Sequence, residues 1–163
     1  MVLENKLTLI SDEVYEYISF KDHYSVIQDE ELRNHSVVLS SFGKTLHLTG
    51  WKIGYLHAPE KLFQKILDVH QFLVFSVHKP SQLAIASYVA LNNYEVSPKK
   101  LFLNKKRLVE QKLAKSKFKV YPCEGTYFLI LDYRSISVKT DVEFCEDLVV
   151  NHGVGAIPIS VFY

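Results

Sequence analysis

The sequence predicts an α/β unit followed by a smaller α+β unit. Short apolar runs at residues 7–10 and 36–39 are bounded by polar residues, the pattern of strands buried on both faces of a parallel sheet. Helical spacing follows, and after residue 118 short strands cluster around one helical segment. We therefore expect pieces of two domains, over residues 1–96 and 97–163.

The first unit continues with a third strand and helices. Residues 51–57 resemble a strand that ends before Pro59, which lies in the first turn of a helix. Pro80 begins a second helix, and Ser97 with Pro98 caps a third, which extends to about residue 116. In this third helix we expect a buried stripe of apolar residues, namely Leu101, Leu108 and Leu113.

The second unit alternates differently. Strands are expected at 118–121 and 127–132, on either side of a turn. Thr140 and Glu143 form a capping box for a helix that Gly153 ends. We expect another strand from Val154 onward. The chain opens into one apolar run and closes on another, which suggests that both domains are truncated; the alternative is an edge strand at the C-terminus.

Composition narrows the classes of protein. The 163 residues carry a formal net charge of +1, with 48% hydrophobic and 23% charged residues, so overall charge favours neither nucleic acid nor acidic partners. Cys123 and Cys145 form no C-x-x-C pair, and no apolar stretch reaches the roughly 20 residues that cross a bilayer. We expect a cytoplasmic protein without a membrane partner and with reduced cysteines.

Five polar residues supply the groups that an aldehyde cofactor with a phosphate requires. A lysine amine reacts with aldehydes, a carboxylate holds a ring nitrogen protonated, a phenol donates a hydrogen bond, and a hydroxyl with a second cation binds phosphate. Four of these residues come just after a predicted strand, where open α/β sheets build ligand sites, and Lys52 lies within the third predicted strand. They are Asp12, Tyr15, Ser41, Lys44 and Lys52.

Each of these residues also has a simpler interpretation. Asp12 alone is typical of a helix cap, Tyr15 of a core aromatic, Ser41 of a turn, and Lys52 of a strand lysine whose amine reaches water. The Gly-Lys-Thr triplet suggests a nucleotide phosphate loop, but that motif needs glycine where Val38 stands, within an apolar strand. We therefore set the nucleotide hypothesis aside.

Taken together, these motifs resemble fold-type I, class I/II aminotransferases that depend on pyridoxal phosphate. The resemblance rests on Ile10-Ser11-Asp12-Glu13-Val14-Tyr15 and on Ser40-Ser41-Phe42-Gly43-Lys44-Thr45 followed by Thr49-Gly50-Trp51-Lys52. It extends through residues 122–128 and 156–162, and is closest to the kynurenine/glutamine aminotransferase branch and to bacterial methionine aminotransferases. It implies an aspartate aminotransferase-like large domain and a small C-terminal domain, both truncated, from the central to C-terminal part of such an enzyme.

The resemblance also implies roles. Lys44 is the expected Schiff-base lysine and proton carrier, Asp12 the partner of the pyridine nitrogen, and Tyr15 the hydrogen-bond partner of the ring oxygen. Ser41 and Lys52 are the expected phosphate ligands, with lysine replacing the arginine of many relatives. Phe75 matches an aromatic residue that reaches the partner subunit's substrate pocket, and packing at a helix end is an equal alternative.

Three further expectations concern partners and activity. The parent enzyme is expected to be a homodimer that exchanges an amino group between an amino acid (methionine, glutamine or aromatic) and a 2-oxo acid. The alternative is a catalytically incomplete fragment, because the substrate-carboxylate arginine and the upstream phosphate loop of the family are not in these residues. We expect no metal, since no histidine pair has metal-site spacing, and no nucleic acid, since a solvated helix face explains the basic segment 99–119.

Overall fold

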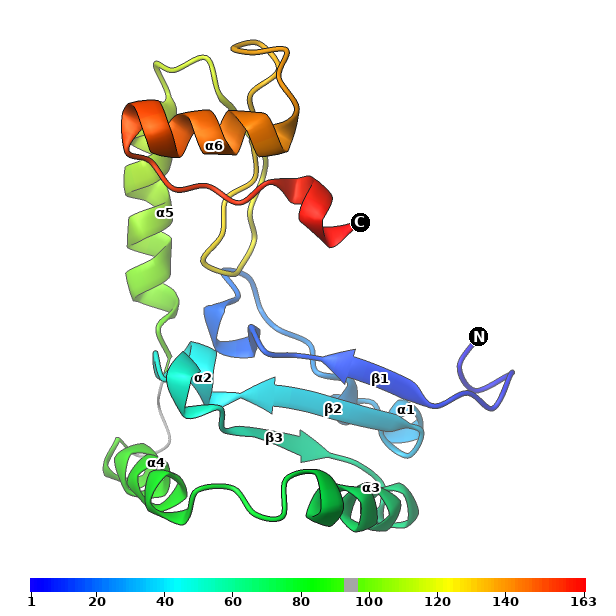
Figure 1. Cartoon of the computed structure of the whole chain (residues 1–163). Coiled ribbons are helices and arrows are strands. Elements are labelled where there is room, and N and C mark those ends of the chain that lie inside the picture. Colours follow the sequence, from blue (N-terminus) through cyan, green and yellow to red (C-terminus); the bar gives the residue numbers. More distant parts are fainter. Residues whose placement is uncertain (93–96) are drawn as a thin grey trace. The chain divides into compact units, whose positions relative to one another are not determined.

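The computed structural model describes residues 1–92 and 97–163. The chain divides into two compact units (Figure 1). The first contains Met1–Lys106 together with Glu124–Tyr127, and the second contains Arg107–Cys123 together with Phe128–Tyr163. A short return of the chain, Glu124–Tyr127, therefore belongs to the first unit, although its neighbours in sequence belong to the second.

The described elements follow the expected order of strands and helices. Those of the first unit are β1 (Leu9–Asp12), η1 (Glu16–Ile18), η2 (Val26–Gln28), α1 (Glu30–Arg33), β2 (Ser36–Ser41), α2 (Phe42–Thr45), η3 (Thr49–Trp51), β3 (Gly54–His57), α3 (Glu60–Leu73) and α4 (Lys79–Leu91). The remaining elements are α5 (Lys99–Leu113), which begins in the first unit and ends in the second, β4 (Lys119–Val120), β5 (Leu131–Asp132), α6 (Asp141–His152) and η4 (Ile159–Phe162).

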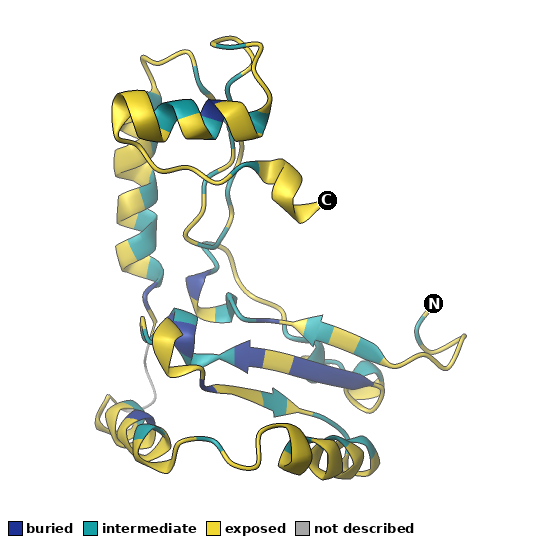
Figure 2. Cartoon of the chain, in the orientation of Figure 1, coloured by how far each residue is buried: buried dark blue, intermediate teal, exposed yellow. Residues whose placement is uncertain are grey.

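The first unit is organised by a three-stranded sheet in the order β1-β2-β3 (Figure 1). β2 pairs parallel to β1, with Asp12 opposite Leu39, and antiparallel to β3, with Ser41 opposite Gly54. Because both of its edges are paired, β2 is the most buried strand (Figure 2). The predicted parallel pair is thus confirmed, and β2 positions the other two strands.

The first and third predicted strands differ from expectation in where they begin, and the first also differs in its burial. The first strand begins two residues late and alternates between half-buried and exposed positions instead of being buried on both faces, because β1 is an edge strand. The third strand does not begin at Trp51: Thr49–Trp51 form a 3-10 turn and Lys52 has a left-handed backbone with φ of 55°. An extended ladder cannot pass through that conformation, so β3 begins only at Gly54.

The helices begin close to their predicted starts. Pro59 caps α3, and Pro80 lies in the first turn of α4, where its missing N–H costs no hydrogen bond. Ser97 Oγ accepts a hydrogen bond from the Lys99 amide at 3.3 Å at the start of α5. None of the helices in the described ranges combines the length and the apolar character that a bilayer crossing requires.

The expected apolar stripe of α5 is wrong. Leu101 and Leu108 are exposed, and only Leu113 of the three is half-buried. Phe102 turns inward in the first unit, where its ring lies 5.6 Å from that of His47. The spacing of apolar residues does not show which face of a helix with apolar residues on several sides is covered. In α5 the face that carries Phe102 is covered, through its ring contacts.

The second unit is built on α6 and a two-stranded antiparallel pair, β4 and β5. The capping box of Thr140 and Glu143 is present, and Gly153 ends α6 with φ of 64°, both as predicted. Phe144 is buried on α6 and stacks on Tyr133 at 4.2 Å between ring centroids. The strand predicted at 127–132 is reduced to Leu131–Asp132.

The strand predicted from Val154 onward is wrong. In the described part of the second unit this segment joins no sheet, and it ends in the short 3-10 helix η4. The Asp141 carboxylate accepts hydrogen bonds from the Ser160 amide at 2.7 Å and from its hydroxyl at 2.9 Å. These bonds return the segment to the start of α6, where no strand edge is available.

A substitution at Gly54 tests the pairing of β2 with β3. A Cβ atom there would lie 2.6 Å from the Ser40 carbonyl oxygen, whereas a Cβ at Gly50 would meet no atom within 4 Å. We expect Gly54→Ala to lower the free energy of unfolding by about 2 kcal/mol. Gly50→Ala, the matched control, should change it by less than about 0.5 kcal/mol. Urea unfolding followed by circular dichroism measures both, and equal stability of the two variants would contradict the described register.

Candidate functional site

Asp12 lies at the carboxyl end of β1, where the strand gives way to a turn. Its Oδ1 accepts a hydrogen bond from the Val14 amide at 3.2 Å, which shapes the turn that leads to Tyr15. The parallel register places Asp12 beside Leu39, on the exposed face of the sheet, and Ser41 follows on the same face two residues later. Two predicted site residues on different strands therefore share one face.

Glu13 anchors this turn from the opposite face. Its side chain is buried, with only 7% of the residue exposed. The carboxylate accepts hydrogen bonds from the Ser11 hydroxyl at 3.1 Å and the Val26 amide at 3.0 Å, and it pairs with His23 Nε2 at 3.0 Å. Burial raises the pKa of the carboxyl, but these hydrogen bonds and one from Ser25 outweigh burial and lower it.

Ser41 and Gly43 shape the turn from β2 into α2. Ser41 Oγ accepts a hydrogen bond from the Gly43 amide at 3.1 Å and donates to the Ile53 carbonyl at 3.3 Å. A Cβ on Gly43 would lie 3.2 Å from Thr49 Cα, so the backbone is tightly confined. The strand therefore continues directly into the helix, and Lys44 lies in the first turn after the end of the strand.

Lys52 is brought near Ser41 by the pairing of β2 with β3. It is exposed and immediately precedes Ile53, whose carbonyl also accepts a hydrogen bond from the Phe42 amide at 3.2 Å. Its left-handed backbone is uncommon for a residue other than glycine. The hydroxyl and the second cation predicted for a phosphate therefore come from adjacent strand ends.

The Lys44 amine lies between two tyrosines. Nζ donates a hydrogen bond to the Tyr127 hydroxyl oxygen at 2.7 Å and lies 5.9 Å from the centre of the Tyr15 ring. The two rings meet edge to face, with centroids 5.7 Å apart. Tyr15 was predicted from sequence, whereas Tyr127, 83 residues from Lys44, was not.

The return segment Glu124–Tyr127 reaches the site through backbone contacts with residues 18–20. The Phe20 amide donates to the Glu124 carbonyl at 2.8 Å, and the Thr126 amide donates to the Ile18 carbonyl at 3.1 Å. Gly125 bridges to Ser19, and a Cβ on this glycine would lie 3.3 Å from the Ile18 carbonyl oxygen. No local pattern predicts this long-range pairing; the sequence signals are the glycine in the turn and the family resemblance over residues 122–128.

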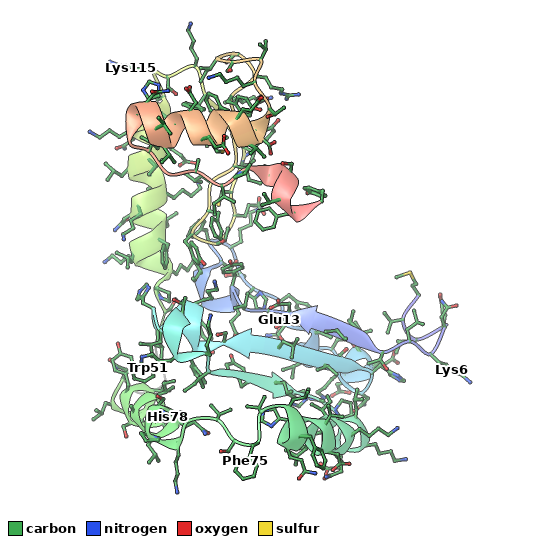
Figure 3. The ribbon with its side chains drawn as sticks, viewed as in Figure 1. Lys6, Glu13, Trp51, Phe75, His78 and Lys115 are labelled. Atoms are coloured by element: carbon green, nitrogen blue, oxygen red, sulfur yellow. The ribbon has the colours of Figure 1, made fainter. Side chains whose placement is uncertain are left out.

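Phe75 lies on the loop between α3 and α4, where Figure 3 shows it turned away from the sheet. Its backbone is left-handed, with φ of 65°, and 86% of the residue is exposed. The alternative of packing at a helix end is therefore wrong in this chain. The role of Phe75 in a partner subunit's substrate pocket stays a prediction.

One group of potential metal ligands occurs among the described residues. Side-chain atoms of Glu13, Glu16 and His23 lie within 4.8 Å of one another. Glu16 accepts hydrogen bonds from the Ser40 hydroxyl at 2.6 Å and from the Tyr55 hydroxyl, and Glu13 has the donors given above. Hydrogen bonds to these side chains account for their proximity without a metal ion. The expected absence of a metal stays a prediction.

The fold and the site define a class: an α/β protein with a lysine amine held by phenols beyond a central strand and a carboxylate beyond the neighbouring strand. Comparison with known proteins agrees. Residues 1–163 match the family model described as aminotransferase class I and II. The chain therefore belongs to the class I and II aminotransferase family, and membership implies the cofactor pyridoxal phosphate.

Individual members of the family differ in how similar they are to this chain. Methionine aminotransferase of Escherichia coli (strain K12) is 45% identical over 161 residues, which are 97% of this chain and 42% of the relative. The kynurenine–oxoglutarate transaminase of Dictyostelium discoideum is 29% identical over 96% of this chain and 41% of its own length. The chain thus spans about two fifths of the relatives that it matches.

Solved structures agree with this similarity. The structure of Escherichia coli YbdL, reported with a methionine aminotransferase function, superimposes with a TM-score of 0.95 at 44% identity and covers 99% of this chain and 43% of that one. N-succinyldiaminopimelate aminotransferase of Mycobacterium tuberculosis gives a TM-score of 0.92 at 29% identity, with the same shares of 99% and 43%. The predicted aminotransferase fold is confirmed.

The residues present fit pyridoxal phosphate in their chemistry. The site offers one amine beside two phenols, an exposed carboxylate on the sheet face that also carries a hydroxyl, and a second lysine that precedes the residue to which this hydroxyl is hydrogen-bonded. Each group matches one part of the cofactor: the aldehyde, the ring oxygen, the ring nitrogen and the phosphate. The roles of the individual residues remain predictions.

Replacement of Glu13 tests the anchor beneath the site. Because the native pKa is lowered, the carboxylate stabilises the fold above the unfolded pKa of about 4.3, and this contribution is lost as the pH falls through the native value. We expect Glu13→Gln to reduce the free energy of unfolding by about 1–3 kcal/mol at pH 7, since the amide has one acceptor oxygen where the carboxylate has two and so loses part of the hydrogen bonding that the carboxylate makes with Ser11, Val26 and His23. The difference from the native protein should shrink below about pH 4.

Urea unfolding at neutral and acidic pH, followed by the fluorescence of Trp51, measures this difference. Glu4→Gln is the control, because Glu4 is an exposed carboxylate that pairs only with the N-terminus in the described contacts. A difference that stays constant between pH 7 and pH 3 would show that the Glu13 carboxylate has no lowered pKa.

Proposed function

We propose that the protein to which this chain belongs is an aminotransferase that uses pyridoxal phosphate held by Lys44. One observation carries the proposal: the Lys44 amine is held 2.7 Å from one phenol and beside another, beyond the central strand of a chain that matches the aminotransferase family throughout. The 45% identity to a methionine aminotransferase supports the same activity.

The cofactor would supply an aldehyde for amines and a ring that accepts the electron pair left when Cα loses a proton. Lys44 Nζ would take and return the proton at the substrate Cα, since it is the basic group beyond β2. Asp12 would hold a proton on the ring nitrogen with its exposed carboxylate, and the Tyr15 hydroxyl would bind the ring oxygen.

Ser41 and Lys52 would bind the phosphate. The β2–β3 pairing places Lys52 next to Ile53, whose carbonyl accepts a hydrogen bond from the Ser41 hydroxyl, which supports a shared ligand. Lysine supplies charge without the paired donors of arginine, so phosphate binding at Lys52 depends on charge more than on orientation. We expect this binding to weaken as ionic strength rises, because Lys52 is exposed.

For the substrates, we propose an amino acid of the methionine, glutamine or aromatic type and a 2-oxo acid. The similarity to a methionine aminotransferase and to a kynurenine–oxoglutarate transaminase supports this range. Phe75 would line the substrate pocket of a partner subunit, because its ring is exposed and its backbone is fixed in an unusual conformation. This role requires a homodimer, which we propose for the whole protein.

Two further proposals follow from the family. The whole protein is cytoplasmic and acts in amino acid metabolism. Residues 1–96 belong to the cofactor-binding domain and residues 97–163 to the small domain. We propose no nucleic-acid partner, since the lysines of α5 are explained as a solvated helix face.

The second candidate is that the 163-residue chain is inactive by itself. The chain spans 42% of the methionine aminotransferase that it resembles, and the outer face of its sheet is open, with Ile10 67% exposed. A cofactor bound on a solvent-exposed face would dissociate readily and would not be held in one orientation. This candidate and the activity of the whole protein are compatible.

Cofactor attachment tests the proposed function. After incubation with pyridoxal phosphate and reduction with borohydride, we expect a pyridoxyl group on Lys44 by peptide mass spectrometry. Lys44→Met should remove this modification, whereas Lys115→Met, a change of an exposed lysine in the second unit, should leave it unchanged. Modification spread evenly over the surface lysines in the native chain would reject the assignment of Lys44.

Turnover by the purified chain tests the second candidate. The purified chain, incubated with methionine, a 2-oxo acid and pyridoxal phosphate, should give no new amino acid above the rate of free cofactor, because the sheet face that carries the site is open. Chromatographic detection of the amino acid product measures this. Sustained turnover by the native chain that Lys44→Met abolishes would show that the chain is a complete catalyst.

A further inference from the structure

Tyr127 is the immediate partner of the Lys44 amine. The distance from Nζ to the hydroxyl oxygen is 2.7 Å, while the distance from Nζ to the ring centre is 5.1 Å. The nitrogen therefore lies beyond the hydroxyl and not over the ring face. A hydrogen bond from the amine, and not a cation–π contact, is the main interaction.

The Tyr127 ring is held on two sides within the first unit. Tyr15 meets it at an interplanar angle of 79°, and Phe102 of α5 lies 5.8 Å away between centroids at 34°. Thr126, the preceding residue, has a left-handed backbone with φ of 64°, which is a rare conformation for a β-branched side chain. The backbone contacts of Glu124–Tyr127 with residues 18–20 maintain this conformation and fix where the hydroxyl lies.

The pKa values of Lys44, Tyr127 and Tyr15 are affected by their contacts with one another. The hydrogen bond between Lys44 and Tyr127 raises the pKa of the amine and lowers that of the Tyr127 phenol, and hydrogen bonding with Tyr15 lowers the Tyr127 pKa further. Burial raises the pKa of Tyr15. On the side of α5, the Phe102 ring lies between Tyr127 and the ring of His47. The partner of the lysine is therefore a phenol in a small aromatic frame.

We propose that Tyr127 is a positioning residue that anchors the protonated Lys44 amine in the cofactor-free protein and so sets the pH at which this amine becomes nucleophilic. The ammonium must release one proton to solvent and break its bond to the Tyr127 oxygen before the nitrogen lone pair is available, while Tyr127 keeps its own proton. This inference rests on the proposed function, because it assigns the anchored amine to aldehyde chemistry.

The pH profile of Lys44 labelling tests the anchor. In the full chain without cofactor, competitive acylation with acetic anhydride, read by mass spectrometry, gives the fraction of free amine at each lysine. Tyr127→Phe keeps the ring and removes the oxygen. We expect its Lys44 profile to move to lower pH, and labelling at pH 8 should rise about tenfold if the midpoint falls by about one pH unit. Lys115, in the same samples, serves as the internal reference.

Tyr24→Phe is the matched control, since Tyr24 is an exposed tyrosine of the first unit. Its Lys44 profile should equal that of the native chain. If Tyr127→Phe and Tyr24→Phe give the same Lys44 profile, Tyr127 does not anchor the amine and the proposal is overturned.

The coupling between the two groups must be reciprocal, which gives a second measurement that does not need the Tyr127→Phe protein to fold. In Lys44→Met the Tyr127 phenol should ionise at higher pH than in the native chain, because the hydrogen bond from the amine is gone. Ultraviolet absorbance near 295 nm follows tyrosine ionisation. An unchanged titration in Lys44→Met would overturn the proposal.

Borohydride reduction at several pH values distinguishes the failure of this inference from the failure of the proposed function. A pyridoxyl group on Lys44 that forms at lower pH in Tyr127→Phe than in the native chain supports both. The same pH dependence in both proteins overturns the anchor and leaves the function intact. The absence of a pyridoxyl group on Lys44 at every pH overturns the proposed function, and with it the role of Tyr127 in cofactor attachment.

Discussion

The pairing of β2 with both of its neighbours is the constraint on which the site depends. The parallel register with β1 sets the Asp12 turn beside Leu39, and the antiparallel register with β3 sets Lys52 beside the hydrogen-bonded end of Ser41. A slip of one residue would turn Asp12 or Ser41 to the other face of the sheet. The burial of β2 opposes such a slip, because a shift of one residue toward the C-terminus would move the buried Val38 side chain to the exposed position of Leu39.

Left-handed backbone conformations occur at two predicted site residues and at Thr126, which precedes Tyr127. Lys52, Phe75 and Thr126 have left-handed backbones without being glycine, and two of them were predicted site residues. Such conformations cost on the order of 1–3 kcal/mol each and persist where surrounding contacts impose them. For Thr126 those contacts are the hydrogen bonds to residues 18–20, and for Lys52 they are the bonds of Ile53 to Ser41 and Phe42.

The two faces of the sheet differ in their polar chemistry. Beneath the turn after β1, the Glu13 and Glu16 carboxylates are saturated by donors such as Val26 and Ser40, which makes this network structural. At the carboxyl ends of the strands, Asp12 is exposed and the Lys44 amine contacts phenols of modest basicity. Rigid support on one side and available groups on the other are what a site for a covalently held cofactor requires.

The sequence by itself determined what is encoded within a few residues. The strand-end positions of Asp12 and Ser41, the proline at the start of α4 and the caps of α6 by Thr140 and Gly153 depend on local chemistry, and the structure agrees with each. The family could be recognised from the same short motifs, because each motif consists of residues that are consecutive in the sequence and lie within one strand and the turn after it.

Tertiary structure alone decided the contacts between distant segments. Tyr127 reaches Lys44 across 83 residues, Phe102 rather than Leu101 turns inward on α5, and Asp141 draws Ser160 away from the predicted strand. Propensity and periodicity report which face of a segment is apolar, but not which partner covers it. The partner is selected by the free energy of the whole arrangement, in which a hydrogen bond or a ring contact between remote residues decides among locally equivalent choices.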